Sequence, residues 1–261
     1  MPTCKVNNVE LYYEVNGEGR PIVFTHGASW NHKQWDAQVE FFSENYQTIV
    51  WDVRGHGNST LPEEDFDSED FSRDLIGLLD HLQIDQAILC GLSMGGHISL
   101  QTAIRYPERV SALVLIGTPF TNTFDWLEKL FIPLNRWSHQ FIPMSYVANF
   151  QASILSTSNN NVTKRYIEEA VSSMSHKNWL RIWNAVTSME SGEDLGKIDC
   201  PTLILQGEHD SMIKRQQHYM NKCIKKSKFV IVENANHATN LDNPTEVNQL
   251  INQFLQLSGT A

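Results

Sequence analysis

The sequence contains few cations and few cysteines. Its 261 residues include 20 Lys and Arg against 30 Asp and Glu, which gives a formal net charge of −10. Nucleic-acid backbones and anionic membranes bind cationic surfaces, so this charge argues against either as a partner. The four cysteines are far apart and form no C-x-x-C pair: Cys4, Cys90, Cys200 and Cys223. This spacing predicts free thiols in a reducing cytoplasm and neither a zinc nor an iron site.

Long hydrophobic runs are also missing. No apolar stretch approaches the roughly 20 residues that span a membrane, and residues 1–8 lack the apolar core and small-residue cleavage site of a signal peptide. We therefore expect a cytoplasmic protein that does not insert into a membrane. The length fits one large domain with an insertion, and the sequence leaves the oligomeric state open.

Short apolar segments alternate with amphipathic helical periods along most of the chain. The predicted strands cover residues 9–15, 21–25, 47–51, 86–90, 110–116, 202–206 and 228–232. The later strands are nearly continuous apolar runs, which is typical of strands that are covered on both faces. The pattern predicts an α/β fold with a mostly parallel, twisted sheet flanked by helices.

Two helices have recognisable start signals. Apolar residues from Phe71 to Leu82 share one helical face, with Ser68 as the expected N-cap. The last helix is expected to begin with Asn243 as N-cap, Pro244 at its first position and Glu246 at its third.

One segment interrupts the alternation and is rich in aromatic residues. We interpret residues 119–193 as a helical cap inserted into a core domain made of residues 1–118 and 194–261. Five aromatic side chains of the cap are candidates for a substrate pocket: Trp126, Trp137, Phe141, Trp179 and Trp183. The alternative is an extra helical layer that packs its aromatic residues into its own core. The cations of the cap are spread out and are expected to be solvated: Lys129, Arg136, Lys164, Arg165, Lys177 and Arg181.

The strongest chemical signal is Gly91-Leu92-Ser93-Met94-Gly95, which matches G-x-S-x-G. A predicted strand precedes this motif and a helical period follows it. A tight strand-to-helix turn of this kind exposes the serine hydroxyl at the carboxyl edge of a sheet. We therefore expect Ser93 to be a nucleophile.

A serine hydroxyl needs a base, and the base needs an acid that orients it. His237 follows the last predicted strand, and Asp210 follows the strand before it, so both are expected at the same sheet edge as Ser93. Asp125 is the alternative acid. His26 and His56 lie beside glycines and are interpreted as turn residues, while His97 is interpreted as a packed or capping residue.

The oxyanion of a tetrahedral intermediate needs two hydrogen-bond donors. One is expected to be the backbone N–H of Met94, directly after the nucleophile and at a helix N-terminus. The other is expected in the loop His26-Gly27-Ala28-Ser29, where Ala28 is the preferred donor and Ser29 the alternative.

These motifs together resemble the α/β-hydrolase family over nearly the whole chain outside the cap. The matching segments are His26-Gly27, Asp52 to Ser59, Gly91 to Gly96, Gly207 to Asp210, and Asn236-His237. The sequence is most similar to small bacterial carboxylesterases, lactonases and cofactor-free haloperoxidases. The resemblance implies a structural role for the turn at residues 54–59 and no cofactor. A serine at the elbow argues against the dehalogenase and epoxide-hydrolase branches, which have Asp there.

We therefore expect a serine hydrolase that cleaves a small to medium, uncharged carboxylic ester or lactone through an acyl-enzyme. Fold alone does not determine function. The same triad also fits hydrolysis of carbon–carbon bonds, acyl transfer to peroxide or alcohol, or a small-molecule sensor that is not an enzyme.

Overall fold

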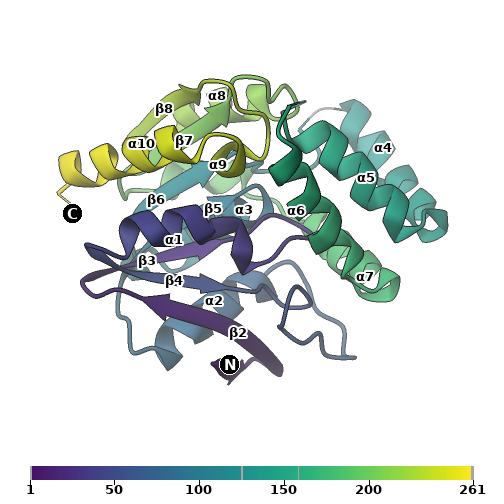
Figure 1. Cartoon of the computed structure of the whole chain (residues 1–261), viewed down its shortest axis with the longest axis horizontal. Helices are drawn as coiled ribbons and strands as arrows, with labels where there is room; N and C mark the ends of the chain where they lie inside the picture. The colour runs from purple at the N-terminus through teal and green to yellow at the C-terminus, as the bar shows by residue number, and fades with distance from the viewer. Residues whose placement is uncertain (1, 125, 158, 260–261) are drawn as a thin grey trace.

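The computed structural model describes residues 2–124, 126–157 and 159–259, and within them eight strands form one sheet (Figure 1). Their order across the sheet is β1-β2-β4-β3-β5-β6-β7-β8. The strands are β1 Thr3–Val6, β2 Val9–Asn16, β3 Arg20–Thr25, β4 Tyr46–Trp51, β5 Ala87–Leu92, β6 Val110–Ile116, β7 Thr202–Gly207 and β8 Ser227–Val232. Only the β1–β2 and β2–β4 pairs among them are antiparallel. The predicted mostly parallel α/β sheet is confirmed. The four-residue edge strand β1 was missed because only one of its side chains is buried, too few for an alternating pattern.

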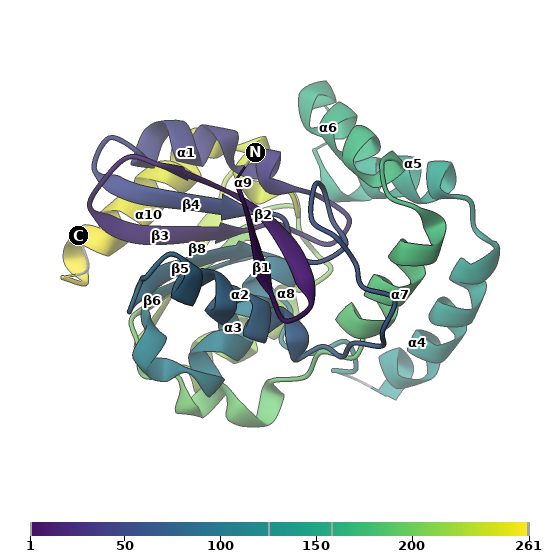
Figure 2. The same ribbon diagram turned by 90° about the horizontal axis from the view of Figure 1, so that it is seen from below.

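Helices cover both faces of the sheet (Figure 2). Helices α1, Asp36–Phe42, and α10, Pro244–Leu257, pack together on one face. Helices α2, Asp70–His81, and α3, Met94–Arg105, pack together on the other. The remaining core elements are α8 Lys214–Cys223, α9 Thr239–Asp242 and the short 3₁₀ helices η1 His32–Trp35, η2 Pro107–Arg109 and η4 Gly192–Lys197. Because the sheet lies between two helical layers, β5 and β7 are buried along their whole length.

The predicted start of α10 is confirmed, whereas the predicted start of α2 is wrong. The Asn243 side chain accepts a hydrogen bond from the Glu246 backbone N–H at 3.3 Å. At α2, Asp67 replaces Ser68 as the capping side chain, since its carboxylate accepts from the N–H groups of Glu69 and Asp70 at 2.7 and 3.2 Å. A carboxylate at this position also interacts favourably with the positive end of the helix dipole.

A group of four helices interrupts the sheet between β6 and β7. These are α4 Trp126–Ser138, α5 Met144–Leu155, α6 Asn161–Ser172 and α7 His176–Val186, with the short helix η3, His139–Phe141, after α4. They lie together to one side of the sheet (Figures 1 and 2). An antiparallel bridge between Thr121 and Glu190 joins the two ends of the segment. We propose that this is the cap insertion, with boundaries at residues 119 and 193. No helix in the described part of the chain is long and apolar enough to cross a membrane.

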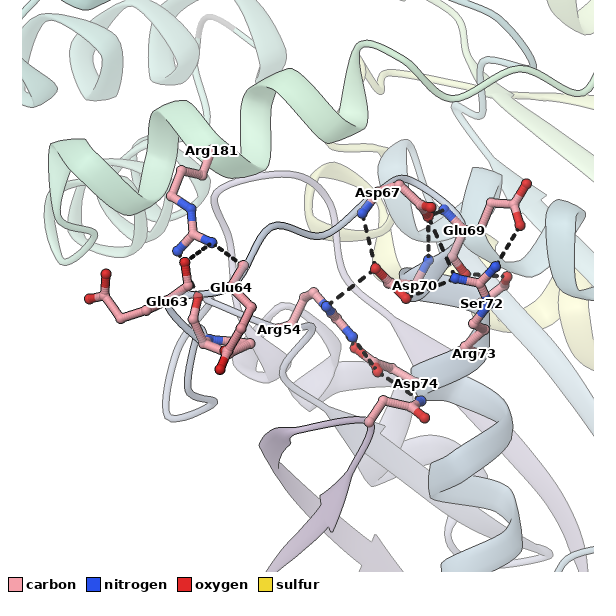
Figure 3. Close-up of polar contacts among 12 residues, drawn as sticks. Arg54, Glu63, Glu64, Asp67, Glu69, Asp70, Ser72, Arg73, Asp74 and Arg181 are labelled. Carbon is pink, nitrogen blue, oxygen red and sulfur yellow. Dashed lines mark hydrogen bonds and ion pairs between the residues drawn. The ribbon is translucent and has the colours of Figure 1, made fainter.

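A buried ion pair joins the turn after β4 to α2 (Figure 3). The Arg54 guanidinium contacts the Asp74 carboxylate through two hydrogen bonds, Nε to Oδ2 at 2.6 Å and Nη2 to Oδ1 at 2.7 Å. Both side chains are almost inaccessible to water. Burial raises the pKa of Asp74, although the guanidinium opposes that shift. The resemblance implied that residues 54–59 are structural, and this bidentate pair is a contact that could have such a role.

Arg181 connects the cap to the same region. From α7 it donates to the backbone carbonyls of Pro62 at 2.7 Å and Glu64 at 2.5 Å (Figure 3). Its guanidinium lies 5.5 Å from the centre of the Phe66 ring, and that of Arg54 lies 5.3 Å from it. The expectation that Arg181 is simply solvated is therefore wrong, because its donors bind the loop that precedes α2.

The Arg54–Asp74 pair predicts an unequal response to two substitutions on α2. Asp74→Ala leaves a buried guanidinium without its bidentate partner and should lower the free energy of unfolding by about 3–5 kcal/mol. Arg73→Ala removes surface ion pairs to Glu69 and Asp70 and should cost at most about 1 kcal/mol. Urea unfolding measures both variants. Similar losses in the two variants would contradict the structural role of the buried pair.

Candidate active site

Ser93 lies at the turn between β5 and α3 in a conformation that few non-glycine residues adopt. Its backbone has φ 54° and ψ −116°, so the turn is strained. A Cβ atom at Gly91 would lie 2.3 Å from the backbone of Gly95, and one at Gly95 would lie 2.0 Å from the Thr25 carbonyl oxygen. Both glycines of the motif are therefore required by close backbone packing. Ser93 itself is partly exposed among buried neighbours.

His237 and Asp210 are hydrogen-bonded to each other at the same sheet edge. The distance from His237 Nδ1 to Asp210 Oδ2 is 2.7 Å, and both side chains are buried. Asp210 Oδ1 also accepts from the Met212 backbone N–H at 3.1 Å. Because Nδ1 is engaged by the carboxylate, Nε2 is the imidazole nitrogen left for proton transfer.

Ser93 and His237 line the same cavity, although no hydrogen bond joins their side chains in the described part of the chain. Contacts of this kind often tighten only when substrate is bound. The alternative acid, Asp125, lies outside the described residues.

Two hydrogen bonds to the Gly27 carbonyl oxygen orient the Gly27–Ala28 peptide in the loop after β3. The Gly27 carbonyl accepts from His26 Nδ1 at 2.8 Å and from the Trp30 N–H at 3.2 Å. A trans peptide is planar, so the Ala28 N–H in the same peptide unit points the opposite way. Neither that N–H nor the Met94 N–H has a hydrogen-bond partner among the described residues.

The alternative donor, Ser29, is engaged elsewhere. Its backbone N–H donates to His56 Nε2 at 3.1 Å. A donor already satisfied in this way is not available to an oxyanion, so Ala28 is the better candidate in this loop.

His26 and His56 hold this loop from the core side, a role that the sequence analysis missed. His26 Nε2 accepts from the Val53 N–H at 3.0 Å, and His56 Nδ1 donates to the Arg54 carbonyl at 3.1 Å. Burial lowers the pKa of His26 to about 4 and that of His56 to about 3. Both rings are therefore neutral near pH 7 and can accept a backbone N–H. Their glycine neighbours were the available signal, since they indicated close backbone packing at both positions.

A cavity of about 380 Å³ opens between the cap and the sheet edge. Ala28, Ser93 and His237 lie on its core side, and Trp179 and Trp183 lie on its cap side. None of its described lining residues is Asp, Glu, Lys or Arg. A second cavity of about 280 Å³ adjoins Ser93 and is bordered by Met94 and by α4.

Three of the five predicted pocket residues lie outside the large cavity. Trp126, Trp137 and Phe141 are 68%, 58% and 70% exposed, and none of them lines either cavity at Ser93. The physical reason is that neither α4, which carries Trp126 and Trp137, nor the short helix η3, which carries Phe141, buries any of its side chains. Their assignment to the pocket is therefore corrected, and α5 instead contributes Val147 and Phe150. The sequence signal for Val147 and Phe150 was weak, because an apolar helix face that lines a cavity has the same pattern as one that packs in a core.

The described residues contain no group of three or more His, Cys, Asp or Glu side chains that could hold a metal ion.

Comparison with known proteins gives consistent matches over the length of the chain. Residues 20–244 match the family model for the alpha/beta hydrolase fold. The chain is similar to 3-oxoadipate enol-lactonase 2 of Acinetobacter baylyi, with 25% identity over 259 residues that cover 97% of this chain and 96% of that protein.

Solved structures agree with this match. The crystal structure of the enol-lactonase from Burkholderia xenovorans LB400 superposes with a TM-score of 0.90 at 23% identity, covering 98% of this chain and all of that one. A thermophilic esterase from Thermogutta terrifontis has a TM-score of 0.87 at 25% identity, covering 98% and 97% of the two chains.

The buried neutral histidines predict that acid destabilises the protein. His97 is a third member of this group, since it is buried, lies 3.0 Å from Ser191 Oγ, and has a pKa lowered to about 3. The unfolded chain binds protons at these sites below the ordinary value of 6.5, whereas the folded protein does not until about pH 4 or lower. The free energy of unfolding should therefore fall as the pH decreases from about 6.5 to 4, and each of the three histidines should contribute up to about one proton to the slope.

Urea midpoints measured at a series of pH values test this prediction. His97→Gln keeps a hydrogen-bonding side chain but removes one titrating group, so its slope should be smaller by about one proton. Stability that is constant between pH 7 and pH 4.5 in the unaltered protein would show that the histidines are not held neutral.

Proposed function

The chain belongs to the α/β-hydrolase family, and from this premise we propose that it hydrolyses a carboxylic ester or lactone through an acyl-enzyme on Ser93. The observation that carries the proposal is the buried His237–Asp210 hydrogen bond beside the serine elbow. The similarity to an enol-lactonase and an esterase supports ester or lactone chemistry.

In the proposed mechanism, Ser93 Oγ attacks the substrate carbonyl carbon while His237 Nε2 accepts the hydroxyl proton. Asp210 keeps the imidazole in the required tautomer and stabilises its cationic form. The N–H groups of Ala28 and Met94 donate to the oxyanion of the tetrahedral intermediate.

Collapse of that intermediate expels the alcohol oxygen, which takes the proton from His237 and leaves the acyl group on Ser93. Water then attacks the acyl-enzyme with the same base, which releases the carboxylic acid and restores the serine. In a lactone the alcohol and the acid belong to one molecule, so ring opening leaves both on the same product.

The lining of the large cavity supports an uncharged substrate. Trp179, Trp183, Val147 and Phe150 provide an apolar wall, and no charged side chain lines the described cavity. Burying a carboxylate there without a partner would be strongly unfavourable. We therefore propose that an uncharged ester or lactone is preferred to one that bears a free carboxylate, and that the partner is a small molecule in the cytoplasm.

Replacing the nucleophile should abolish turnover. Ser93→Ala is expected to lower kcat for p-nitrophenyl acetate by several orders of magnitude, up to about a million-fold, because no other group can form the acyl-enzyme. An organophosphate should add one covalent group to Ser93 in the unaltered protein and none in the variant, as mass spectrometry would show. A variant that keeps more than a tenth of the activity would exclude this nucleophile. Labelling without turnover on any ester or lactone would favour a small-molecule sensor.

The cavity wall should determine which acyl chains are accepted. For p-nitrophenyl esters, kcat/KM should rise by up to about fourfold for each added methylene, equivalent to about 0.8 kcal/mol, and then drop once the cavity is full. Trp183→Ala enlarges the cavity and should move the drop to longer chains. Trp137→Ala is the matched control, since Trp137 is exposed outside the cavity and should leave the profile unchanged. Identical profiles for the two variants would contradict this assignment of the acyl site.

A further inference from the structure

Two helices of the cap contact the loop that carries the proposed oxyanion donor. The Trp179 indole N–H, on α7, donates to Ser29 Oγ at 2.9 Å, and the bond is buried. Gln151 Nε2, on α5, lies 3.5 Å from the same oxygen. Ser29 directly follows Ala28, so the cap contacts the residue next to the proposed donor.

Ser29 has a conformation that requires external support. Its φ is 70°, in the left-handed region, where a residue with a Cβ atom is uncommon. On the core side, His56 accepts a hydrogen bond from the Ser29 backbone N–H. On the cap side, the Trp179 indole N–H donates to the Ser29 hydroxyl oxygen. Ser29 is also the third residue of the turn that the Trp30 N–H closes by donating to the Gly27 carbonyl at 3.2 Å, where a positive φ is required. If either contact were lost, relaxation of φ at Ser29 would break this turn and release the Gly27–Ala28 peptide, whose N–H is the proposed donor.

A third cap helix contacts the same loop two residues further on. The Tyr166 hydroxyl, on α6, donates to the Asn31 carbonyl at 3.1 Å and accepts from the Asn31 N–H at 3.2 Å. The segment from Ser29 to Asn31 is therefore bound to the cap at both ends. On its other side the segment is hydrogen-bonded to the core through His56. Contacts on both sides therefore restrain its backbone conformation.

We propose that Trp179 is a positioning residue for the oxyanion hole. Its indole N–H keeps Ser29 in the left-handed conformation and thereby fixes the direction of the Ala28 N–H. The cap is then part of the machinery that stabilises the transition state as well as a wall of the substrate cavity. This inference rests on the proposed function, because it assumes that Ala28 donates to an oxyanion formed at Ser93.

Trp183 provides a matched control within the same helix. Its ring stacks on that of Trp179 with centroids 5.6 Å apart and 10° between the planes, and it lines the same cavity. Its indole N–H, however, donates to Asn135 Oδ1 on α4 at 2.9 Å, within the cap itself. Replacing either Trp with Phe removes one indole N–H, but only that of Trp179 contacts the loop of residues 26–31, which carries the Ala28 N–H.

The experiment compares Trp179→Phe with Trp183→Phe. Loss of one complete oxyanion donor lowers kcat by about 10²–10³-fold, so a displaced donor should lower kcat for p-nitrophenyl acetate by roughly 10–100-fold. Trp179→Phe should show this loss in kcat, with a change in KM no larger than that of Trp183→Phe, because both rings line the same cavity. Its affinity for a trifluoromethyl ketone, whose adduct with Ser93 places an oxyanion in the hole, should fall by the same factor. Trp183→Phe should instead act only on KM and on the acyl-chain profile, because its side chain lines the cavity and its indole N–H binds Asn135 within the cap.

A double-mutant cycle identifies the contact that is responsible. Ser29→Ala removes the acceptor of the Trp179 bond while keeping a Cβ atom, and it should reproduce the loss in kcat. The double variant Trp179→Phe/Ser29→Ala should be no slower than the slower single variant, since both changes break one hydrogen bond. Additive losses, or a loss in Trp179→Phe that falls on KM alone, would overturn the proposal. Organophosphate labelling of the unaltered protein separates the two failures: if Ser93 does not react, the proposed function fails, whereas reaction at Ser93 with undiminished kcat in Trp179→Phe refutes only the positioning role.

Discussion

The parallel alignment of β3, β5, β6, β7 and β8 is the constraint on which the candidate site depends. Parallel strands end at the same edge of a sheet, so segments that are far apart in the chain meet there. The loops after β3, β5, β7 and β8 contribute the proposed oxyanion donor Ala28, together with Ser93, Asp210 and His237. The cap follows β6 at this same edge, so the space between cap and core becomes the cavity. The strands are held in register by their own hydrogen bonds and by burial on both faces, which makes the edge rigid enough to support a strained serine.

Buried polar groups at this edge are arranged by hydrogen bonds because water cannot satisfy them. Desolvation keeps His26 and His56 neutral, and neutrality lets each accept a backbone N–H with one ring nitrogen while it donates with the other. The same desolvation raises the pKa of Asp74, whose carboxylate is held by the Arg54 guanidinium. The loop of residues 26–31 thus contacts neutral histidines on its core side and the indole of Trp179 on its cap side. A loop held on both sides can retain a left-handed residue at Ser29 that an unsupported loop would relax.

The four cap helices differ in how many side chains they bury. Helices α5, α6 and α7 face the core and contact the loops that follow β3 and β8, including a hydrogen bond from the Ala238 N–H to the Leu155 carbonyl at 2.7 Å. Helix α4 borders the second cavity beside Ser93 but exposes most of its apolar side chains. Aromatic content alone therefore does not identify the residues of a pocket, since two of the five predicted aromatic residues line the cavity and three face solvent.

The sequence by itself determined the α/β fold, seven of the eight strands, the start of α10 and the motifs that suggest Ser93, His237 and Asp210. It could do so because apolar periodicity, capping residues and a glycine-flanked serine are local patterns that short-range sterics impose. Only the tertiary structure decided that Asp67 caps α2, that Ser29 is engaged by His56, and that Trp179 faces the cavity while Trp137 faces solvent. Each of these depends on a helix orientation or on a partner that is chosen by three-dimensional packing. The separation of 150 positions between Ser29 and Trp179 shows why no local pattern could have joined them.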